Sequence, residues 1–528
     1  MGRTRFRHIV LALGIVGSVA VTGCSSDSTS SASTASLPAS IPGLPSAALK
    51  VMNKPAYAKG SWALLVRDLT SGQTLISYNA NKLVEPASVT KTYSMGAGWL
   101  FFGPHSRVVT PVKQMGTRSG DTLDGSLVLV GKGDLTMGGR TKLDGTLDFA
   151  NLDHNDANAL PGATLTTEDP LAGLNRLAAQ VRAAGISHVQ GDVIIDDRLF
   201  STTLEGQPIS PIIINNNLID FTTTPATEGQ TATVVMRPQV APWTVTSEVQ
   251  TVAPGEATKI AVTSPTPGHV VLSGSIAAGA PPAVNVYAFD DPATYARTAF
   301  IEALERAGVT VSANPTTTNS TASLPSQAAV NALPSVAHLD SLPLWEETKY
   351  VLKVSYNRGA ETMICRLAVA AGSTDCDTGL TKAGDIWRNA GMDTRGVSLI
   401  DGSGLSNNVV TASSQVQLQA IMSKRPDASL WKSTLPIIGV DGSLALVKTS
   451  PGCKGKVFAK TGSLAIPDYF NNRIRIPSKA LGGYIDAASG RHLAFAIVAS
   501  NATYRSVSGV FAANNDVGEV ACAIQQAY

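Results

Sequence analysis

The sequence is poor in charge and in aromatic side chains. Charged residues make up 15% of the 528 and aromatic residues 5%, and the formal net charge is only +2. A chain with so little net charge has no electrostatic means of gathering phosphates, so we expect no nucleic-acid partner. The sequence also lacks zinc-type Cys/His pairs and a phosphate-binding GxxxxGK[ST] loop, and we expect no metal and no cofactor.

Histidine is scarce as well, and its seven copies are scattered. His154 lies in the polar run Asp153-His154-Asn155-Asp156, which has two interpretations. A histidine between carboxylates could hold a metal ion. A polar run without apolar neighbours is more typical of a solvated loop, and we favour the loop.

The first 24 residues have the pattern of an export signal. Arg3, Arg5 and Arg7 precede an apolar run over residues 9–21, which is too short to span a membrane as a stable anchor. The run ends in Val-Thr-Gly-Cys24, which resembles the bacterial lipobox, in which the cysteine is lipidated and becomes the new N-terminus. The alternative is an ordinary secretory signal in which Cys24 is incidental.

Residues 25–45 begin as a run rich in Ser, Ala and Thr. Such a composition cannot bury a core, and it predicts a flexible tether. With a lipid on Cys24, the rest of the chain would be exported and held in the cell envelope, at the outer face of the cytoplasmic membrane.

If Cys24 is lipidated, four cysteines remain, and an even number in an oxidising compartment favours disulfides. They are Cys365, Cys376, Cys453 and Cys522. Three pairings are open. We favour Cys365–Cys376 because that loop is short and the second cysteine follows a predicted helix, which leaves Cys453–Cys522. Four buried free thiols are the alternative.

The length exceeds what one hydrophobic core supports, so several domains are expected. Strand-like alternation dominates from about residue 114 to 335. Before and after it, strand-like runs at 62–78 and 492–499 accompany helical patterns at 88–102 and from 342 to 424. We predict one α/β domain interrupted by a long, mostly β insertion.

Ser88-Val89-Thr90-Lys91 matches the SxxK pattern. Residues three apart share one face of a helix, so the two side chains would lie one turn apart. A serine hydroxyl is a weak nucleophile and needs a base within hydrogen-bond reach. Lysine can be that base only when neutral, which requires its pKa to fall by roughly 3 units from about 10.4.

The SxN pattern occurs four times, and its surroundings decide which copy matters. Ser355-Tyr356-Asn357 leads directly into an apolar helical pattern, which is the context a site residue at a helix start would have. The other three copies begin at Ser77, Ser312 and Ser406; the first lies in a hairpin strand and the last follows a turn.

Lys460-Thr461-Gly462-Ser463 matches KTG followed by a hydroxyl residue, after a strand-like run. Two hydroxyls beside an ammonium can bind a carboxylate, and Gly462 would let a substrate backbone approach closely. The three motifs in this order are typical of class A β-lactamases and penicillin-binding proteins. The gap of about 270 residues between Ser88 and Ser355 is too long for a β-lactamase, whose motifs share one compact domain.

The sequence resembles the class C low-molecular-mass penicillin-binding proteins, the D-alanyl-D-alanine carboxypeptidase/endopeptidase family, from about residue 45 to 528. Beyond the three motifs, the segments that carry the resemblance are 85–88, 102–107, 131–136, 191–197 and 401–406. The resemblance implies an α/β (α+β) fold: a penicillin-binding/β-lactamase-like transpeptidase domain with two inserted, mostly β domains. We place the transpeptidase domain at 46–113 and 336–528. The outer inserted domain is placed at 114–133 and 206–335, and the second, nested in it, at 134–205.

The resemblance also implies the chemistry: hydrolysis of peptidoglycan stem peptides through an acyl-enzyme, with β-lactams as inhibitors. The implied roles are nucleophile for Ser88, base for Lys91, proton transfer for Ser355, amide binding for Asn357, carboxylate binding for Lys460 and Thr461, and oxyanion binding for the N–H groups of Ser88 and Ser463.

Two departures from the family pattern stand out. The middle residue of SxN is Tyr356, and residues 465–479 form an insertion that either shapes substrate choice or is a solvated loop. Two other functions stay open: a β-lactamase or esterase on the same scaffold, and a non-catalytic cell-wall-binding lipoprotein. The balance of carboxypeptidase and endopeptidase activity is open as well.

Overall fold

The computed structural model describes residues 37–506 and 508–528. The predicted signal peptide, Cys24 and the first part of the predicted tether lie outside the described residues. Within the described ranges, no helix is both long enough and apolar enough to cross a bilayer.

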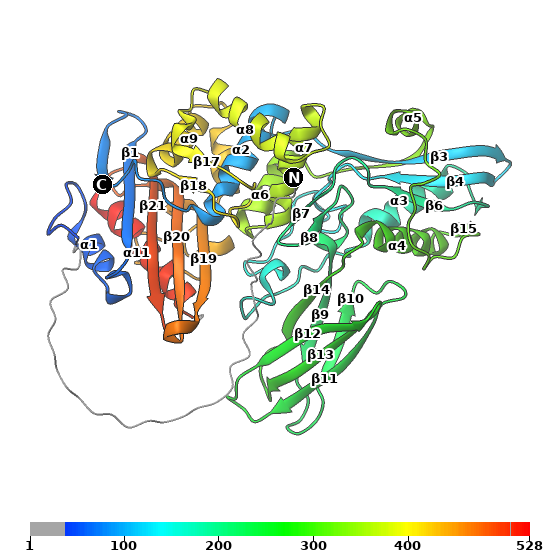
Figure 1. Ribbon diagram of the computed structural model, residues 1–528, viewed down its shortest axis with the longest axis horizontal. Coiled ribbons are helices and arrows are strands. Elements are labelled where there is room, and N and C mark those ends of the chain that lie inside the picture. The colour runs from blue at the N-terminus through cyan, green and yellow to red at the C-terminus, as the bar shows by residue number, and fades with distance from the viewer. Residues whose placement is uncertain (1–36, 507) are drawn as a thin grey trace.

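The two ends of the described chain build one domain around a five-stranded antiparallel sheet (Figure 1). Its strand order is β19-β20-β21-β1-β2, so the first strands lie beside the last ones, as in the pair Leu64 and Ile497. The strands are β1 (Ser61–Asp68), β2 (Thr74–Tyr78), β19 (Val457–Asp468), β20 (Arg473–Asp486) and β21 (His492–Tyr504).

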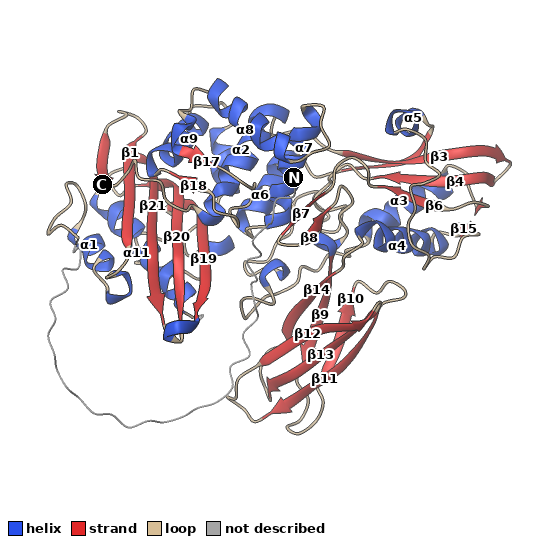
Figure 2. Ribbon diagram, viewed as in Figure 1, coloured by secondary structure: helices blue, strands red, loops and turns tan. Residues whose placement is uncertain are grey.

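Helices cover both faces of this sheet (Figure 2). Apolar residues of α1 and α11 pack on one face, and α9 packs on the other beside a helical cluster with its own core. The helices are α1 (Ser46–Met52), α2 (Lys91–Phe102), α6 (Leu344–Lys353), α7 (Asn357–Ala370), α8 (Asp377–Asn389), α9 (Ala412–Ser423), α10 (Ala428–Thr434) and α11 (Gly509–Ala527). The short ribbon β17 (Val397–Ser398) with β18 (Val409–Val410) lies beside α9.

The insertion has a sheet of its own, which reaches away from the first domain at the right of Figure 1. Its order is β15-β5-β4-β3-β16, with β6 paired to β4, and α3 and α4 share its core. The elements are β3 (Val109–Ser119), β4 (Thr122–Val130), α3 (Ala172–Ala183), β5 (His188–Val189), β6 (Val193–Asp196), α4 (Pro292–Arg306), β15 (Thr310–Val311), α5 (Gln327–Ala332) and β16 (Ser335–Asp340).

Within the insertion, two three-stranded sheets form a second body, seen at the bottom of Figure 1. The orders are β10-β9-β14 and β11-β13-β12. The strands are β9 (Leu218–Thr224), β10 (Thr233–Arg237), β11 (Thr244–Val252), β12 (Lys259–Thr266), β13 (His269–Ala277) and β14 (Ala283–Ala288); the ribbon β7 (Thr202–Leu204) with β8 (Gln207–Ile209) precedes them.

These pairings divide the insertion differently from the predicted division. The segment 134–205, predicted to be the nested domain, supplies α3, β5 and β6 to the outer sheet, and the nested body is 218–288. The outer sheet also extends beyond the predicted limits, to β3 and β16. Alternation of apolar residues identifies strands but does not show which strands pair. Here β4 pairs with β6, which follows it in the chain only after a long crossover that contains α3.

The structure pairs Cys365 with Cys376 and Cys453 with Cys522, the pairs that the sequence favours. The Cα–Cα distances are 4.3 and 5.4 Å. The first disulfide ties α7 to the start of α8, and the second ties the turn before β19 to α11. The second therefore links the strand that carries Lys460 to the helix that supports its sheet.

We predict that the two disulfides contribute unequally to stability. In the chain-entropy account, closing the 69-residue separation of Cys453 and Cys522 is worth about 4 kcal/mol, and closing the 11-residue separation of Cys365 and Cys376 about 3 kcal/mol. Denaturant unfolding of the two double Cys→Ser variants should therefore show the larger loss for Cys453 and Cys522. A non-reducing peptide map that linked Cys453 to Cys365 or Cys376 would contradict the pairing.

Candidate active site

Ser88 and Lys91 lie in contact at the start of α2. Ser88 is in the 3-10 turn η2 (Ala87–Thr90), which runs directly into α2, so Lys91 lies one turn further on. Lys91 Nζ lies 2.8 Å from Ser88 Oγ and 2.8 Å from the carbonyl oxygen of Ser403. The lysine is fully buried and the serine half-buried, so the hydroxyl is within reach of a ligand while its neighbouring amine is shielded from water.

Burial lowers the pKa of Lys91 to about 7, against the opposing charges of Asp401, Asp156 and Glu361. A lysine with that pKa is substantially neutral near pH 7, and a neutral amine can accept a proton. The arrangement therefore gives Ser88 the adjacent base that its hydroxyl needs.

Ser355 meets Lys460 on the other side of the site. Lys460 Nζ, on β19, lies 2.9 Å from Ser355 Oγ and 2.8 Å from the Thr461 carbonyl oxygen. Ser355 has φ +63°, a left-handed conformation that is costly for a residue other than glycine and that concentrates at functional sites. The backbone thus turns sharply to present this hydroxyl between α6 and α7.

Three buried lysines share the site: Lys91, Lys460 and Lys479. Burial, followed by the charges of Lys91 and Lys479, lowers the pKa of Lys460 well below its ordinary value. Three ammonium groups cannot all keep their charge in so small a buried volume. An anionic ligand would favour the charged forms of Lys460 and Lys479, so the electrostatics of this side of the site suit a substrate that carries a carboxylate.

Asn357 and Tyr356 point to different surroundings. Asn357 Oδ1 is buried and has no hydrogen-bond partner, as expected of an amide oxygen that receives an N–H from a ligand. Tyr356 is 2% exposed and packs on Tyr350, with ring centroids 5.2 Å apart, in the helical core. The middle residue of SxN therefore contacts the core, where an aromatic side chain fits.

The hydroxyls of Thr461 and Ser463 each have a polar neighbour that the sequence motifs did not include. Ser443 Oγ, in η6 (Gly442–Leu444), lies 2.7 Å from Thr461 Oγ1. Lys479 Nζ, on β20, lies 2.6 Å from Ser463 Oγ. Neither residue belongs to a recognisable pattern, and only the β19–β20 register could have indicated Lys479.

Two glycines allow close packing around Ser88. A Cβ on Gly462 would lie 2.2 Å from the carbonyl oxygen of Pro86, and one on Gly404 would lie 1.9 Å from that of Ala87. The loop 401–406 and strand β19 therefore pack against the turn that carries Ser88 from two directions. The structure gives Gly462 a role that the sequence did not suggest: it admits the protein's own backbone.

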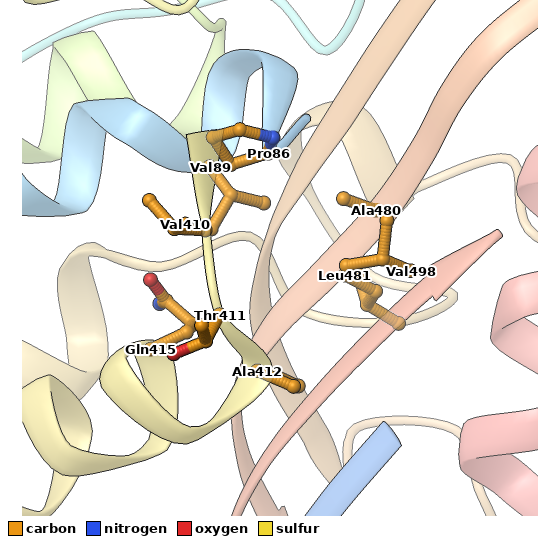
Figure 3. Close-up of a pocket in the computed structure, with 10 residues that line it drawn as sticks. Pro86, Val89, Val410, Thr411, Ala412, Gln415, Ala480, Leu481 and Val498 are labelled. Carbon is orange, nitrogen blue, oxygen red and sulfur yellow. The ribbon is translucent and has the colours of Figure 1, made fainter. Parts of the chain in front are cut away.

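A small cavity lies behind this turn, lined by η2, the start of α9 and strands β20 and β21 (Figure 3). Its volume is about 10 Å³ and most of the lining is aliphatic, including Val89, Val410 and Val498. That volume is at the lower limit for a single water molecule, so the cavity cannot hold a substrate. Ligands must approach Ser88 from its exposed side.

The other SxN serines lie outside the cluster of Ser88, Lys91, Ser355 and Lys460. Ser77 is exposed on β2, and Ser312 is exposed just after β15. Ser406 belongs to the loop that begins at Asp401, and its backbone N–H donates to the Asp401 carboxylate at 2.6 Å. Surroundings, and not the motif itself, distinguish Ser355.

The insertion contributes groups near the site that the sequence did not single out. Burial raises the pKa of Asp156, in η3 (His154–Asp156), to about 6, and the charges of Lys91 and Lys460 oppose that rise. Asn151 Oδ1 accepts the N–H of Gly442 at 2.7 Å. The insertion is therefore part of the site's surroundings and not a remote appendage.

The prediction that His154 lies in a solvated loop is wrong. Its side chain is 2% exposed, with Nδ1 2.7 Å from Asp220 Oδ1 and Nε2 2.9 Å from Arg140 Nη2. Asp153 and His154 are buried because each has a polar partner within the insertion, Asp153 in Arg140 and His154 in Asp220. No group of three or more metal-ligating side chains occurs in residues 37–506 and 508–528.

The segment 465–479 completes strands β19 and β20, which extend past the site as a ribbon; residues 474–478 of β20 also pair with β21, so the ribbon is three strands wide at its base. The tip, at η7 (Tyr469–Asn471), exposes Tyr469 and Phe470 to solvent. At the base of the ribbon, Lys479 is 3% exposed and contacts Ser463. One end of the segment therefore belongs to the site and the other does not.

Comparison with known proteins agrees with this geometry. The chain is 28% identical over 484 residues to a D-alanyl-D-alanine carboxypeptidase of Actinomadura sp. (strain R39), covering 85% of this chain and 79% of that one. It is 32% identical over 176 residues to carboxypeptidase DacB of Mycolicibacterium smegmatis, covering 32% and 36% of the two chains.

Among solved structures, penicillin-binding protein 4 of Haemophilus influenzae has the same fold. The TM-score is 0.64 at 20% identity, over 89% of this chain and 98% of that one. The same protein in complex with a β-lactam gives 0.62 at 19% identity, over 89% and 97%. The predicted penicillin-binding/β-lactamase-like fold with additional β domains is thus confirmed. The sequence model of the D-Ala-D-Ala carboxypeptidase 3 (S13) family matches residues 46–513, and the chain belongs to that family.

Proposed function

We propose that Ser88 is the nucleophile through which this D-Ala-D-Ala carboxypeptidase cleaves the stem peptides of peptidoglycan. The observation that carries the assignment is the contact of 2.8 Å between Ser88 Oγ and the buried amine of Lys91. Family membership supports the reaction, and the orphaned amide oxygen of Asn357 supports the position of the substrate.

In this mechanism Ser88 Oγ attacks the carbonyl carbon of the penultimate D-alanine while Lys91 Nζ takes the hydroxyl proton. Collapse of the tetrahedral intermediate breaks the peptide bond. Ser355, hydrogen-bonded to Lys460, passes a proton to the amine of the departing D-alanine and takes up in its place the proton that Lys91 had accepted. The product is an ester on Ser88. Water then attacks the ester carbonyl while Lys91 takes one of its protons, and Lys91 returns that proton to Ser88 Oγ as the acid product leaves.

The remaining groups bind the substrate and stabilise the transition state. Asn357 Oδ1 would accept the amide N–H, and Thr461 with Lys460 would bind the terminal carboxylate. The backbone N–H groups of Ser88 and Ser463 would hold the oxyanion, where removing one donor typically slows such reactions about 100- to 1000-fold. A β-lactam presents a carboxylate and a strained amide to the same groups and would acylate Ser88.

The cellular location belongs to the same proposal. A basic head, an apolar run and Cys24 in a lipobox-like context support export and lipid anchoring at the outer face of the cytoplasmic membrane. The part of the predicted tether before residue 37 would then let the enzyme reach the cell wall. The prediction that the tether extends to residue 45 is wrong, because Ile41 is 4% exposed and belongs to the core of the catalytic domain. An endopeptidase activity on cross-linked stem peptides would use the same residues.

Acylation by benzylpenicillin tests the nucleophile. We expect one stable adduct per chain, located on Ser88 by intact mass and peptide mapping, and none on Ser88→Ala. The matched controls Ser77→Ala and Ser406→Ala should keep the adduct, since neither serine contacts a lysine of the site. An adduct on the Ser88→Ala protein would sink the assignment, and rapid release of hydrolysed penicillin would favour a β-lactamase.

The pH dependence of acylation tests the base. Since the pKa of Lys91 is lowered to about 7, the neutral form that accepts the proton prevails above pH 7 and is lost below it. The second-order acylation rate should fall about tenfold per pH unit below pH 6 and level off near pH 8. A rate that is constant between pH 5 and 8 would contradict this role.

Variants separate Lys91 from general effects of charge. Lys91→Arg keeps a positive charge but cannot lose it, so acylation should fall about 100- to 10,000-fold. Lys59→Arg, at an exposed lysine, is the matched control and should acylate normally.

Fractionation tests the anchor. We expect the full-length protein to sediment with membranes and to incorporate radioactive palmitate, while Cys24→Ala appears in the soluble fraction without label. Ser26→Ala, two residues away, should behave like the unaltered protein. Membrane association of Cys24→Ala would count against lipidation at this residue.

A further inference from the structure

Lys479 is a buried cation beside the carboxylate-binding motif, and no motif includes it. Its side chain is 3% exposed. Within the described part of the chain, Ser463 Oγ, at 2.6 Å, is the hydrogen-bond partner of its amine, and no carboxylate lies within ion-pair distance. An ammonium in this position has lost most of its hydration and has gained no counter-charge from the protein.

The β19–β20 register fixes this contact. Ser463 and Lys479 are directly opposed across the two strands, so their side chains share one face of the sheet. Because Ser463 Oγ accepts a hydrogen bond from the lysine, its own proton is free to be donated elsewhere. Ser463 is half-exposed, so that proton can be directed to a ligand in the site.

Stability alone does not account for a lysine here. Burial lowers the pKa of Lys479 to about 7, which means that the folded protein holds the charged form at a cost. An apolar side chain of similar volume would fill the same space without that cost. A group that is unfavourable in the empty site but favoured by an arriving anion is what a binding function requires.

We propose that Lys479 is a positioning residue for the free carboxylate of the substrate, acting through Ser463. Its amine polarises the Ser463 hydroxyl, which donates to the carboxylate, and its charge adds to that of Lys460. The pair Lys479–Ser463 would make the enzyme select peptides that end in a carboxylate over amidated ones. This inference rests on the proposed function, because it concerns the same site and the same substrate end.

The test compares two substrates that differ only at the terminal group. For the unaltered protein, Lys479→Met, Lys479→Arg and Arg475→Met, kcat and KM are measured on a diacylated L-Lys-D-Ala-D-Ala peptide and on its C-terminal amide. Methionine keeps the side-chain length without charge, and arginine restores the charge. Arg475 is the matched control, an exposed cation of the same strand whose side chain contacts Asn501.

Lys479→Met should lower kcat/KM for the free acid about 10- to 100-fold, mainly through KM, since one charge-assisted contact is lost. Activity on the amide should change less than about threefold, so the preference for the acid falls with it. Lys479→Arg should recover most of that preference, and Arg475→Met should not alter it. If Lys479 had a purely structural role, Lys479→Met would lower kcat/KM for the acid and the amide by the same factor, and the preference for the acid would not change.

If the amide reacts too slowly for kcat and KM to be measured, a second pair of ligands, one with a free carboxylate and one without, gives the same comparison. Second-order acylation of Ser88 by benzylpenicillin and by its methyl ester is measured by mass, and Lys479→Met should again lose the discrimination. An unchanged preference in Lys479→Met, with either pair, overturns the inference while the proposed function stands. If the unaltered protein neither forms the Ser88 adduct nor releases D-alanine, the proposed function itself has failed.

Discussion

In the proposed mechanism, catalysis depends on the burial of one amine, that of Lys91. Lys91 is fully buried and touches Ser88, and burial is the largest cause of its lowered pKa. A hydrated lysine at the same distance would be an ammonium and could not take the proton. Desolvation of Lys91 therefore converts a common pair of polar residues into a nucleophile and its base. The carboxylates nearby oppose the shift, so the apolar packing must outweigh them.

The fold supplies that packing from segments far apart in the chain. The loop 401–406 covers Lys91 and places the Ser403 carbonyl on its amine, while β19 presses on the turn at Pro86 through Gly462. Pairing of β1 with β21 joins the first and last strands of the chain in one five-stranded sheet. The Cys453–Cys522 disulfide links the turn before β19 to α11. Long-range contacts thus position a site whose first two residues are only three apart.

The helices, strands and motif residues of this domain could be predicted from the sequence. Which strands pair, and which side chains come into contact at the site, could not be predicted as well. SxxK and KTG are short local motifs whose order along the chain is typical of penicillin-binding proteins, so Ser88 and Lys460 could be found. Lys479 and Ser443 could not, because each reaches the site through a strand register or a loop that leaves no local pattern. The same limit explains the division of the insertion, where β4 pairs with β6 across a long crossover. His154 was misjudged because its partners are distant in sequence.

The most direct test of the account is the titration of Lys91 itself. In protein carrying 13C at the lysine ε-carbon, the resonance that disappears in Lys91→Arg reports the protonation of this side chain in the free enzyme. A midpoint near pH 7 would show that burial has made the amine a base at neutral pH, as the structure requires. A midpoint near the ordinary value of about 10.4 would mean that Lys91 is an ammonium beside Ser88, and the proposed mechanism would not hold.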